Sequence, residues 1–230
     1  MIVIISKFLI IKGYLVIKII ILSDPICPWC YIGKKCFDKA IKQFESHYFS
    51  IKWLPFQLNP NMPKEGMDRK NYLIKKFGNE KKTIEVYTPI VNKFNENKID
   101  FDLSKIQITP NTFNANQLIY WSQLEGKGND VVENLFKAYF LEGKNLGDIN
   151  CLIEIGMKSG LTKKITSTVF ENTKDIKIVQ DIENKYRKAG VSGVPTFIIN
   201  NDYVVPGAQS REFWQGVLKE LTQKYRRMYS

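Results

Sequence analysis

Two cysteines separated by a proline and a tryptophan, Cys27-Pro28-Trp29-Cys30, are the side chains in this sequence best suited to covalent chemistry. The spacing places both sulfurs on one helical turn, within reach of a disulfide bond, and the loop they would close is too short to serve as a stability staple. Such a pair cycles between dithiol and disulfide by exchange through a mixed disulfide. The motif therefore predicts a redox site.

The residues around the motif predict how its two thiols differ. Tyr14 to Leu22 is rich in β-branched residues and predicts a buried strand, and apolar residues recur at helical intervals from Tyr31 to His47. Cys27 should therefore be the N-cap of a helix, with Pro28 at its first position. Unpaired amides at a helix N-terminus favour a thiolate and lower the pKa of Cys27. We expect Cys27 to be the exposed, attacking thiol and Cys30 to be the buried, resolving thiol.

A proline far along the chain supports the same site. Pro195 stands directly before a predicted strand, where a proline would normally cost a ladder hydrogen bond. A cis bond between Val194 and Pro195 would bend this loop beside the Cys27 sulfur. The Val194 backbone would then be free to pair with an extended substrate.

The order of the predicted elements is β–α–β, a long helical block, and then β–β–α. The block runs from Asp68 to about Lys188 in apolar stripes split by Gly or Asn, and Ser210 caps a final helix that runs to Leu221. Further strands are predicted at 51–58, 196–199 and 203–205, and helices at 113–125, 130–141, 149–159 and 175–189. We expect an α/β unit formed by residues 14–60 and 161–230, a helical insert at 61–160, and an N-terminal extension at 1–13.

Composition narrows the classes of function. The net charge of +11 comes from 34 basic and 23 acidic residues, but the basic residues form scattered pairs, so we expect no specific nucleic-acid partner. Four cysteines in 230 residues are too few for a disulfide scaffold. His47 is the single histidine and a second CxxC is missing, so we expect no metal. Cys36 and Cys151 are interpreted as buried spectators.

The first 24 residues are very apolar, but Lys7, Lys12 and Lys18 interrupt them. The uncharged stretches are too short for a spanning helix, and the pattern of a secretory signal is missing. We expect a cytoplasmic protein without stable membrane insertion. A weak uncleaved anchor is the alternative.

From about Ile17 to the C-terminal helix, the chain resembles the thioredoxin-fold DsbA-like oxidoreductases, most closely their FrnE-like branch. The residues that carry the resemblance are Ser23–Lys34 (SDPICPWCYIGK), Leu58–Pro63 (LNPNMP), Leu135–Phe140 (LFKAYF), Gly193–Pro195 and Gly207–Gln209. The resemblance implies an α/β thioredoxin fold with an inserted all-helical domain and a protein disulfide oxidoreductase activity.

The resemblance also implies roles for single residues: Cys27 as nucleophile, Cys30 as resolving cysteine and Pro195 as the cis-proline. Pro28, Trp29 and Val194 are the expected substrate contacts. The expected partners are proteins that carry thiols or disulfides, or glutathione, and beyond glutathione as a redox partner we expect no cofactor.

The chain departs from the family pattern at two positions. Thioredoxin-like proteins often keep a buried acid where this chain has Ile21, and the nearby Asp24 is expected to cap the turn before the helix. Trp29 stands where the periplasmic oxidants have a histidine, which predicts a less oxidising couple.

Two other classes of function stay open at this stage. Glutathione-dependent isomerases (2-hydroxychromene-2-carboxylate isomerase) and kappa-class-like transferases share the fold but use a serine where this chain has Cys27. A pure binding protein is the third reading, if Trp29, Tyr31, Trp53 and Phe56 form an exposed aromatic patch.

Overall fold

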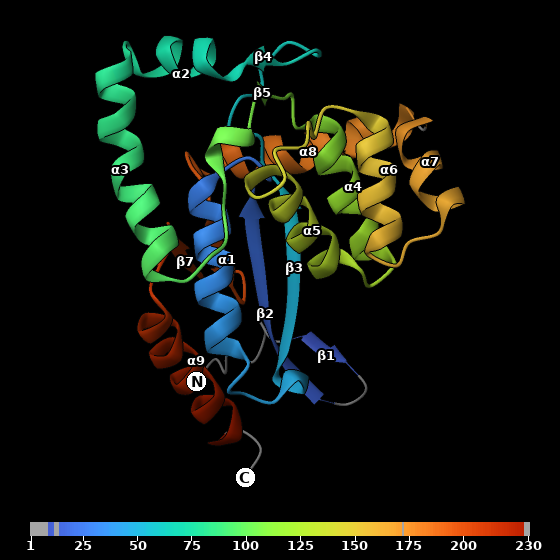
Figure 1. The fold of residues 1–230 in the computed structure, drawn as a ribbon. Coiled ribbons are helices and arrows are strands. Elements are labelled where there is room, and N and C mark those ends of the chain that lie inside the picture. The colour runs from blue at the N-terminus through green and yellow to red at the C-terminus, as the bar shows by residue number, and fades with distance from the viewer. Residues whose placement is uncertain (1–8, 12–13, 172, 228–230) are drawn as a thin grey trace.

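The computed structural model describes residues 9–11, 14–171 and 173–227 and shows a mixed sheet with helices around it (Figure 1). The strands of the sheet are β1 (Leu9–Ile11), β2 (Tyr14–Ser23), β3 (Phe49–Pro55), β6 (Thr196–Ile199) and β7 (Tyr203–Pro206). β2 is central, parallel to β3 and antiparallel to β6, and β7 extends the sheet beyond β6. β1 pairs antiparallel with the start of β2. The rest of the predicted extension, residues 1–8 and 12–13, lies outside the described residues.

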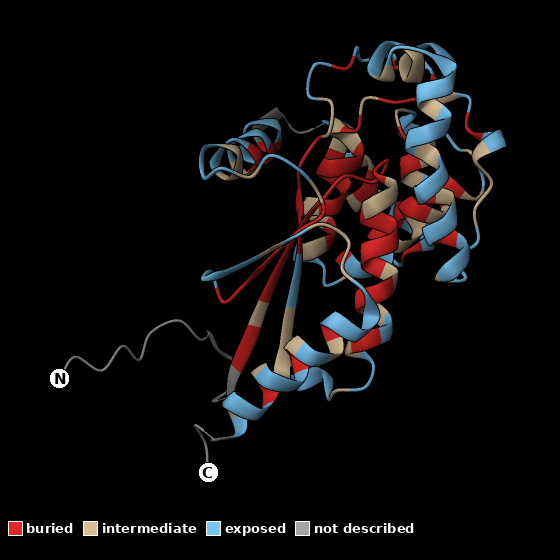
Figure 2. Ribbon diagram, turned by 90° about the vertical axis from the view of Figure 1, so that its left-hand side faces the viewer, coloured by how far each residue is buried: buried red, intermediate tan, exposed pale blue. Residues whose placement is uncertain are grey.

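β2 is buried on both of its faces, as its β-branched run predicts. The helices that cover it are α1 (Pro28–Ile41), α8 (Thr173–Lys188) and α9 (Arg211–Arg227). Ile19 and Ile21 belong to the apolar cluster that includes residues of α1 and α9, whereas Ile20 belongs to a second cluster that α8 covers. Figure 2 shows the buried strands between helices on either side. This double burial fixes the end of β2, and with it the start of α1.

A long helical segment lies between β3 and β6. Its elements are α2 (Arg69–Phe77), α3 (Glu80–Glu96), α4 (Phe113–Leu124), α5 (Gly128–Phe140), α6 (Ile149–Lys158) and α7 (Lys163–Glu171), with a small sheet of β4 (Met67–Asp68) and β5 (Ile108–Thr109). The helices α4 to α7 pack together beside β3, and α2 and α3 form an arm that returns along α1 (Figure 1). The expected α/β thioredoxin fold with inserted helices is therefore confirmed, while the exact domain boundaries stay a prediction.

Most predicted elements are present, with some shifted ends. The predicted helices of the block are confirmed, with ends that differ by at most two residues. The predicted strand 51–58 instead ends at Pro55, because the chain turns there. The Leu58 amide then donates to the Asp24 carboxylate, in the turn before the cysteine motif. The first helix ends at Ile41, where the hydrogen bonds tighten into three-residue turns, rather than at His47. Helix α7 was not predicted separately, because its run of Ile, Thr, Ser and Val has low helix propensity.

The exposed aromatic patch that a pure binding protein would need is absent, because three of its four aromatic residues lie in the core, where such residues are more often found. Tyr31, Trp53 and Phe56 are all buried, with at most 2% of their surface exposed. Tyr31 stacks on Phe136 of α5 with ring centroids 4.9 Å apart. These rings join α1 to the helical segment, so the patch on which the pure binding reading depended does not exist. Within the described ranges, no helix has the length and apolar character needed to cross a membrane.

A charged cluster also ties α1 to the helical segment. Lys34 of α1 is 1% exposed and lies 3.3 Å from Glu133 of α5, and it also pairs with Asp38. Glu133 in addition contacts Lys35 and Lys137. Burial would raise the pKa of Glu133, but the attraction of Lys34, Lys35 and Lys137 outweighs it, so the pKa is lowered. The cluster therefore stabilises the protein only while Glu133 is ionised.

We expect Glu133→Gln to lower the free energy of unfolding by about 2–3 kcal/mol at neutral pH, because Lys34 stays buried with one carboxylate fewer. Since the folded pKa is lowered, this difference should shrink as the pH falls below the range in which glutamates titrate. Urea unfolding at several pH values measures it. Glu154→Gln is the control, because Glu154 is 71% exposed and its ion pair should contribute less than about 1 kcal/mol. Equal losses in both variants would contradict the cluster's role.

Candidate functional site

The two cysteines lie where β2 turns into α1. The Cys27 amide donates to the Asp24 carbonyl at 3.0 Å, which closes the turn, and the Cys27 carbonyl accepts from Cys30 and Tyr31 at 3.1 and 3.2 Å. Cys27 is the N-cap of α1 and Pro28 occupies the start of the helix. The predicted placement of the motif at a strand-to-helix junction is confirmed.

Both thiols of the motif are buried, and all four cysteines are present as free thiols. Cys27 is 3% exposed and Cys30 is 0% exposed, so the prediction that Cys27 is exposed is wrong. The reason lies in the loop before β6: the Cys27 Sγ atom donates to the Val194 carbonyl at 3.6 Å, so this loop covers the sulfur. Any molecule that reaches the Cys27 sulfur by way of this loop must therefore displace the Val194 contact.

The surroundings of Cys30 disfavour the charged form of its thiol. Burial raises the pKa of Cys30 well above its ordinary value, and a hydrogen bond with Cys27 raises it further. Two groups act in the opposite sense, the Asp24 backbone amide and the Ser23 hydroxyl. Cys30 is thus held as a thiol in the resting protein, and burial is the main reason.

The loop before β6 is held against the first turns of α1. The Val194–Pro195 peptide bond is cis. The Gly207 amide donates to the Pro195 carbonyl at 2.8 Å. A Cβ atom on Gly33 would lie 3.1 Å from Pro195 Cγ and 3.4 Å from Ala208 Cα, so a larger residue at this position would push the loop away from α1 by a few tenths of an ångström. The structure thus brings Cys27, Val194 and Pro195 together, as the sequence predicted.

Asp24 does more than the predicted capping. Its side chain accepts from the Ile26 amide at 3.1 Å, which is the expected cap, but also from the Leu58 amide at 2.6 Å and the Thr112 hydroxyl at 3.1 Å. The carboxyl is completely buried, and this burial raises its pKa to about 6. Asp24 therefore joins the motif to the end of β3 and to the start of the helical bundle. Sequence reasoning missed both distant partners because the contacts span long separations without a local pattern.

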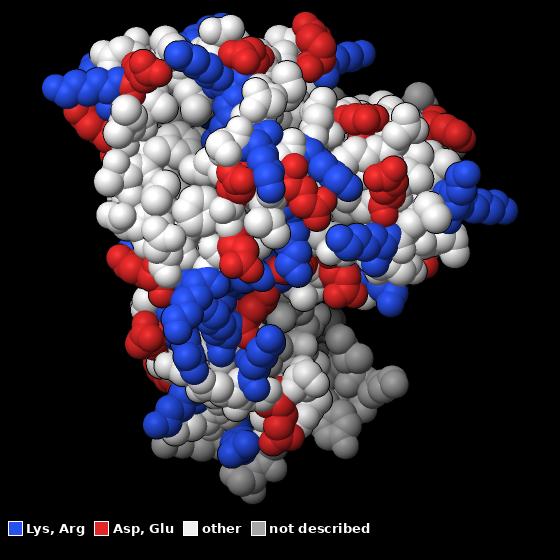
Figure 3. Space-filling view, in the orientation of Figure 1, with Lys and Arg blue, Asp and Glu red and all other residues white. Residues whose placement is uncertain are grey.

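A polar pocket of about 540 Å³ begins at Trp29, which is half-buried, and runs along α1. Its walls come from α1, the end of α3 and the start of α9, and its charged residues are Lys39, Lys93, Lys98, Arg211, Glu96 and Glu212. Figure 3 shows basic side chains gathered where the end of α3 approaches α9, while elsewhere on this face both signs are mixed. The pocket lies beside the cysteine motif and carries an excess of positive charge, a feature that the scattered lysines of the sequence did not predict.

The other two cysteines lie apart from the motif pair. Cys36 lines the polar pocket, is 2% exposed, and donates to the Asn97 side chain at 3.1 Å. Cys151 lies on α6 and is half-buried, which is more open than predicted. Burial raises the pKa of both thiols. Across the described part of the chain, no group of three or more His, Cys, Asp or Glu side chains is arranged to hold a metal.

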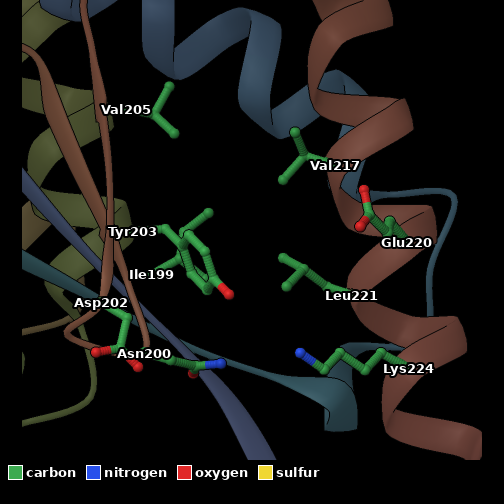
Figure 4. A pocket seen from close by; sticks show the side chains of 9 residues that line it. All are labelled: Ile199, Asn200, Asp202, Tyr203, Val205, Val217, Glu220, Leu221 and Lys224. Carbon is green, nitrogen blue, oxygen red and sulfur yellow. The ribbon is translucent and has the colours of Figure 1, made fainter.

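A more apolar pocket of about 320 Å³ lies between the β6–β7 hairpin and α9 (Figure 4). Val205 and Tyr203 of the hairpin face Val217 and Leu221 of the helix, and Lys224 lies at one end. The cysteines and the loop before β6 do not line it. This pocket is therefore separate from the cysteine pair at the start of α1.

Asp24 should make stability depend on pH. Its pKa is about 6 in the folded protein against 3.8 as the ordinary value, so its favourable contribution is complete below the unfolded pKa and is lost as the pH rises through the folded one. We expect the free energy of unfolding in urea to fall by on the order of 3 kcal/mol through this group between about pH 4 and pH 7. Asp24→Asn should lack this decline, and Asp181→Asn, at an exposed position, should keep it. A decline of parental size in Asp24→Asn would contradict the assignment.

The comparisons with known proteins agree with this geometry. A family model described as DSBA-like thioredoxin domain matches residues 18–219. The uncharacterised protein YwbO of Bacillus subtilis is 26% identical over 213 residues, which cover 90% of this chain and 98% of that protein. A probable DsbA oxidoreductase from Streptomyces coelicolor superposes with a TM-score of 0.79 at 22% identity, over 90% of each chain.

Two further solved structures share the fold at lower identity. A 2-hydroxychromene-2-carboxylate isomerase has a TM-score of 0.70 at 15% identity, over 93% of this chain and 100% of that chain. The cytosolic disulfide reductase DsbM from Pseudomonas aeruginosa, with GSH, has a TM-score of 0.64 at 15% identity, over 90% of this chain and 99% of that chain. The match of the family model extends from within β2 into α9 and includes the cysteine pair and the loop before β6. The chain therefore belongs to the DSBA-like thioredoxin domain family.

Proposed function

We propose that this protein is a thiol-disulfide oxidoreductase that exchanges disulfides through Cys27 and Cys30. The observation that carries the proposal is the pairing of two free thiols on the first turn of α1, with Cys27 against the Val194 carbonyl and Cys30 fully buried beside it. Thiol pairs at a helix N-terminus are suited to exchange because the helix dipole favours the thiolate. The FrnE-like branch remains the subfamily that we propose.

The burial of the two sulfurs supports their roles. Cys27 is the nucleophile, because its sulfur contacts the Val194 carbonyl, the group with which an extended substrate would pair. The Cys27 thiolate attacks a substrate disulfide, forms a mixed disulfide, and releases one substrate thiol. Cys30, with a raised pKa and 0% exposure, waits behind it as the resolving thiol. Its attack on Cys27 closes the internal disulfide and releases the second substrate thiol.

The proposed substrate contacts surround the Cys27 sulfur. Once Cys27 is bonded to a substrate, the Val194 carbonyl loses its thiol partner and is free to accept a hydrogen bond from the substrate backbone. Pro28 and Trp29 follow Cys27 directly at the start of α1, and Trp29 lines the polar pocket. Pro195 sets the direction of the loop that presents Val194. A substrate in an extended conformation fits this arrangement.

We expect Cys27→Ser to reduce exchange to the uncatalysed rate, because the attacking sulfur is lost, and Cys30→Ser to accumulate mixed disulfides. Mixing each reduced variant with a peptide disulfide, quenching with an alkylating reagent and weighing the products measures both effects. Cys36→Ser and Cys151→Ser are the matched controls and should keep parental exchange. Equal activity in Cys27→Ser and Cys30→Ser would contradict the role assignment.

Glutathione is the redox partner that the polar pocket favours. At neutral pH glutathione carries two carboxylates and one ammonium group, and the pocket beside Trp29 offers four basic and two acidic side chains. DsbM, which shares the fold, was solved with GSH and is described as a cytosolic disulfide reductase. The cytoplasm is accordingly the compartment that we propose. A glutathione-dependent isomerase is the second candidate, but the thiol of Cys27 favours exchange over that class.

Replacing both Lys98 and Arg211 by Ala should raise the KM for glutathione by about two- to fivefold, because exposed charge pairs each contribute at most about 1 kcal/mol. Turnover with dithiothreitol, a neutral dithiol, should stay at the parental value. The double variant Lys163→Ala, Lys164→Ala on α7 removes the same charge far from the pocket and serves as the control. A parental KM for glutathione in the pocket variant would contradict a role of this pocket.

A further inference from the structure

The resolving step requires a negative charge on a sulfur that water does not reach. Cys30 is 0% exposed, and burial raises its pKa. Ile21 of β2 belongs to the same apolar cluster as Cys30, and its side chain has no hydrogen-bond donor for a thiolate. The carboxyl of Asp24 is already engaged by Ile26, Leu58 and Thr112. Another group must therefore donate a hydrogen bond that stabilises the Cys30 thiolate.

Ser23 is placed for this task. It is the last residue of β2, opposite Pro55 of β3, and its carbonyl accepts from the Phe56 amide at 3.2 Å, so its backbone is fixed. Its side chain is 2% exposed, and in the part of the chain that the structure describes its Oγ atom has no hydrogen-bond partner of standard geometry. The Cys30 sulfur lies within reach of both this hydroxyl and the Asp24 amide. A buried hydroxyl without a partner costs free energy in the resting protein, so its presence calls for an explanation such as a catalytic role.

We propose that the Ser23 hydroxyl is a catalytic group that donates a hydrogen bond to the Cys30 thiolate as that sulfur attacks the mixed disulfide. The Asp24 backbone amide is the second donor. This inference rests on the proposed exchange through Cys27 and Cys30 and assigns the group that supports its second half. The orphaned hydroxyl gains its partner only when Cys30 is ionised, so the contact favours the reacting state over the resting thiol.

The step balances without an outside reactant. Cys30 attacks the Cys27 sulfur, the bond between Cys27 and the substrate sulfur breaks, and the Cys27–Cys30 bond forms. Over the two steps together, the enzyme pair loses two electrons and the two substrate sulfurs gain them. The proton of Cys30 passes to the departing substrate sulfur, and Ser23 keeps its own proton throughout.

The groups that could alter the titration of Cys30 are few. Cys27 lies on the same helix, and Asp24 lies in the preceding turn, with Glu183 of α8 acting on the Asp24 carboxyl. Variants at Ser23 leave all three in place. A change in the pH profile of these variants therefore reports on the contact between the hydroxyl and the Cys30 sulfur.

The test separates the two halves of exchange in a single turnover. Reduced protein is mixed with a peptide disulfide, and the mixed disulfide is followed by quenching and mass measurement across a range of pH. For Ser23→Ala we expect formation of the mixed disulfide at the parental rate, but resolution slowed by about tenfold at neutral pH, as for loss of one hydrogen bond to a charged group. The pH profile of resolution should move to higher pH. Ser23→Thr, which keeps the hydroxyl, should restore the parental profile.

Ser122→Ala is the matched control, because Ser122 is buried on α4 and its hydroxyl donates to the Ile119 carbonyl, away from the motif. It should leave both steps unchanged. Parental resolution and pH profile in Ser23→Ala would overturn the inference, and so would equal slowing of both steps without a shift in pH profile. If the parent protein forms no mixed disulfide at all, the proposed function itself is wrong, which is a different result.

Discussion

The proposed exchange requires the Cys30 sulfur to become negative inside an apolar core, and the rest of the site depends on this constraint. Cys30 lies at 0% exposure beneath the first turn of α1, where burial alone disfavours its thiolate. Its position follows from β2, whose burial on both faces fixes the strand end at Ser23. The turn at Asp24 then sets the start of α1 and delivers both thiols to the same point.

Hydrogen bonds connect the helical segment to the turn at Asp24. Asp24 accepts from Leu58 after β3 and from Thr112 at the start of α4, so one buried carboxyl connects the motif to two distant parts of the chain. Lys34 and Glu133 make a second connection between α1 and α5. Gly33 lets the loop before β6 approach α1 closely enough for Val194 to reach Cys27. Together these contacts hold the cysteine pair and the proposed substrate edge in one geometry.

The sequence was sufficient to predict those elements whose pattern lies in neighbouring residues. The β-branched run of β2, the N-cap at Cys27 with Pro28 behind it, and the strand after Pro195 all follow from neighbouring residues, and the structure has each of them. The exposure of Cys27 was predicted wrongly, because a carbonyl from a loop far along the chain covers its sulfur. The partners of Asp24 and the charge of the pocket beside Trp29 also depend on segments that only the fold brings together. Tertiary contacts of this kind leave no periodic pattern in a sequence.

A redox titration of the purified protein in glutathione buffers tests the central claim most directly, with free thiols counted by alkylation and mass. We predict a reversible disulfide between Cys27 and Cys30, with a midpoint between about −200 and −270 mV, as for cytosolic thiol reductases and glutaredoxins. Cys36 and Cys151 should stay reduced across the same range. If no disulfide forms between Cys27 and Cys30 at any potential and glutathione instead stays bound, the chain is not a disulfide oxidoreductase and the glutathione-dependent isomerase takes its place.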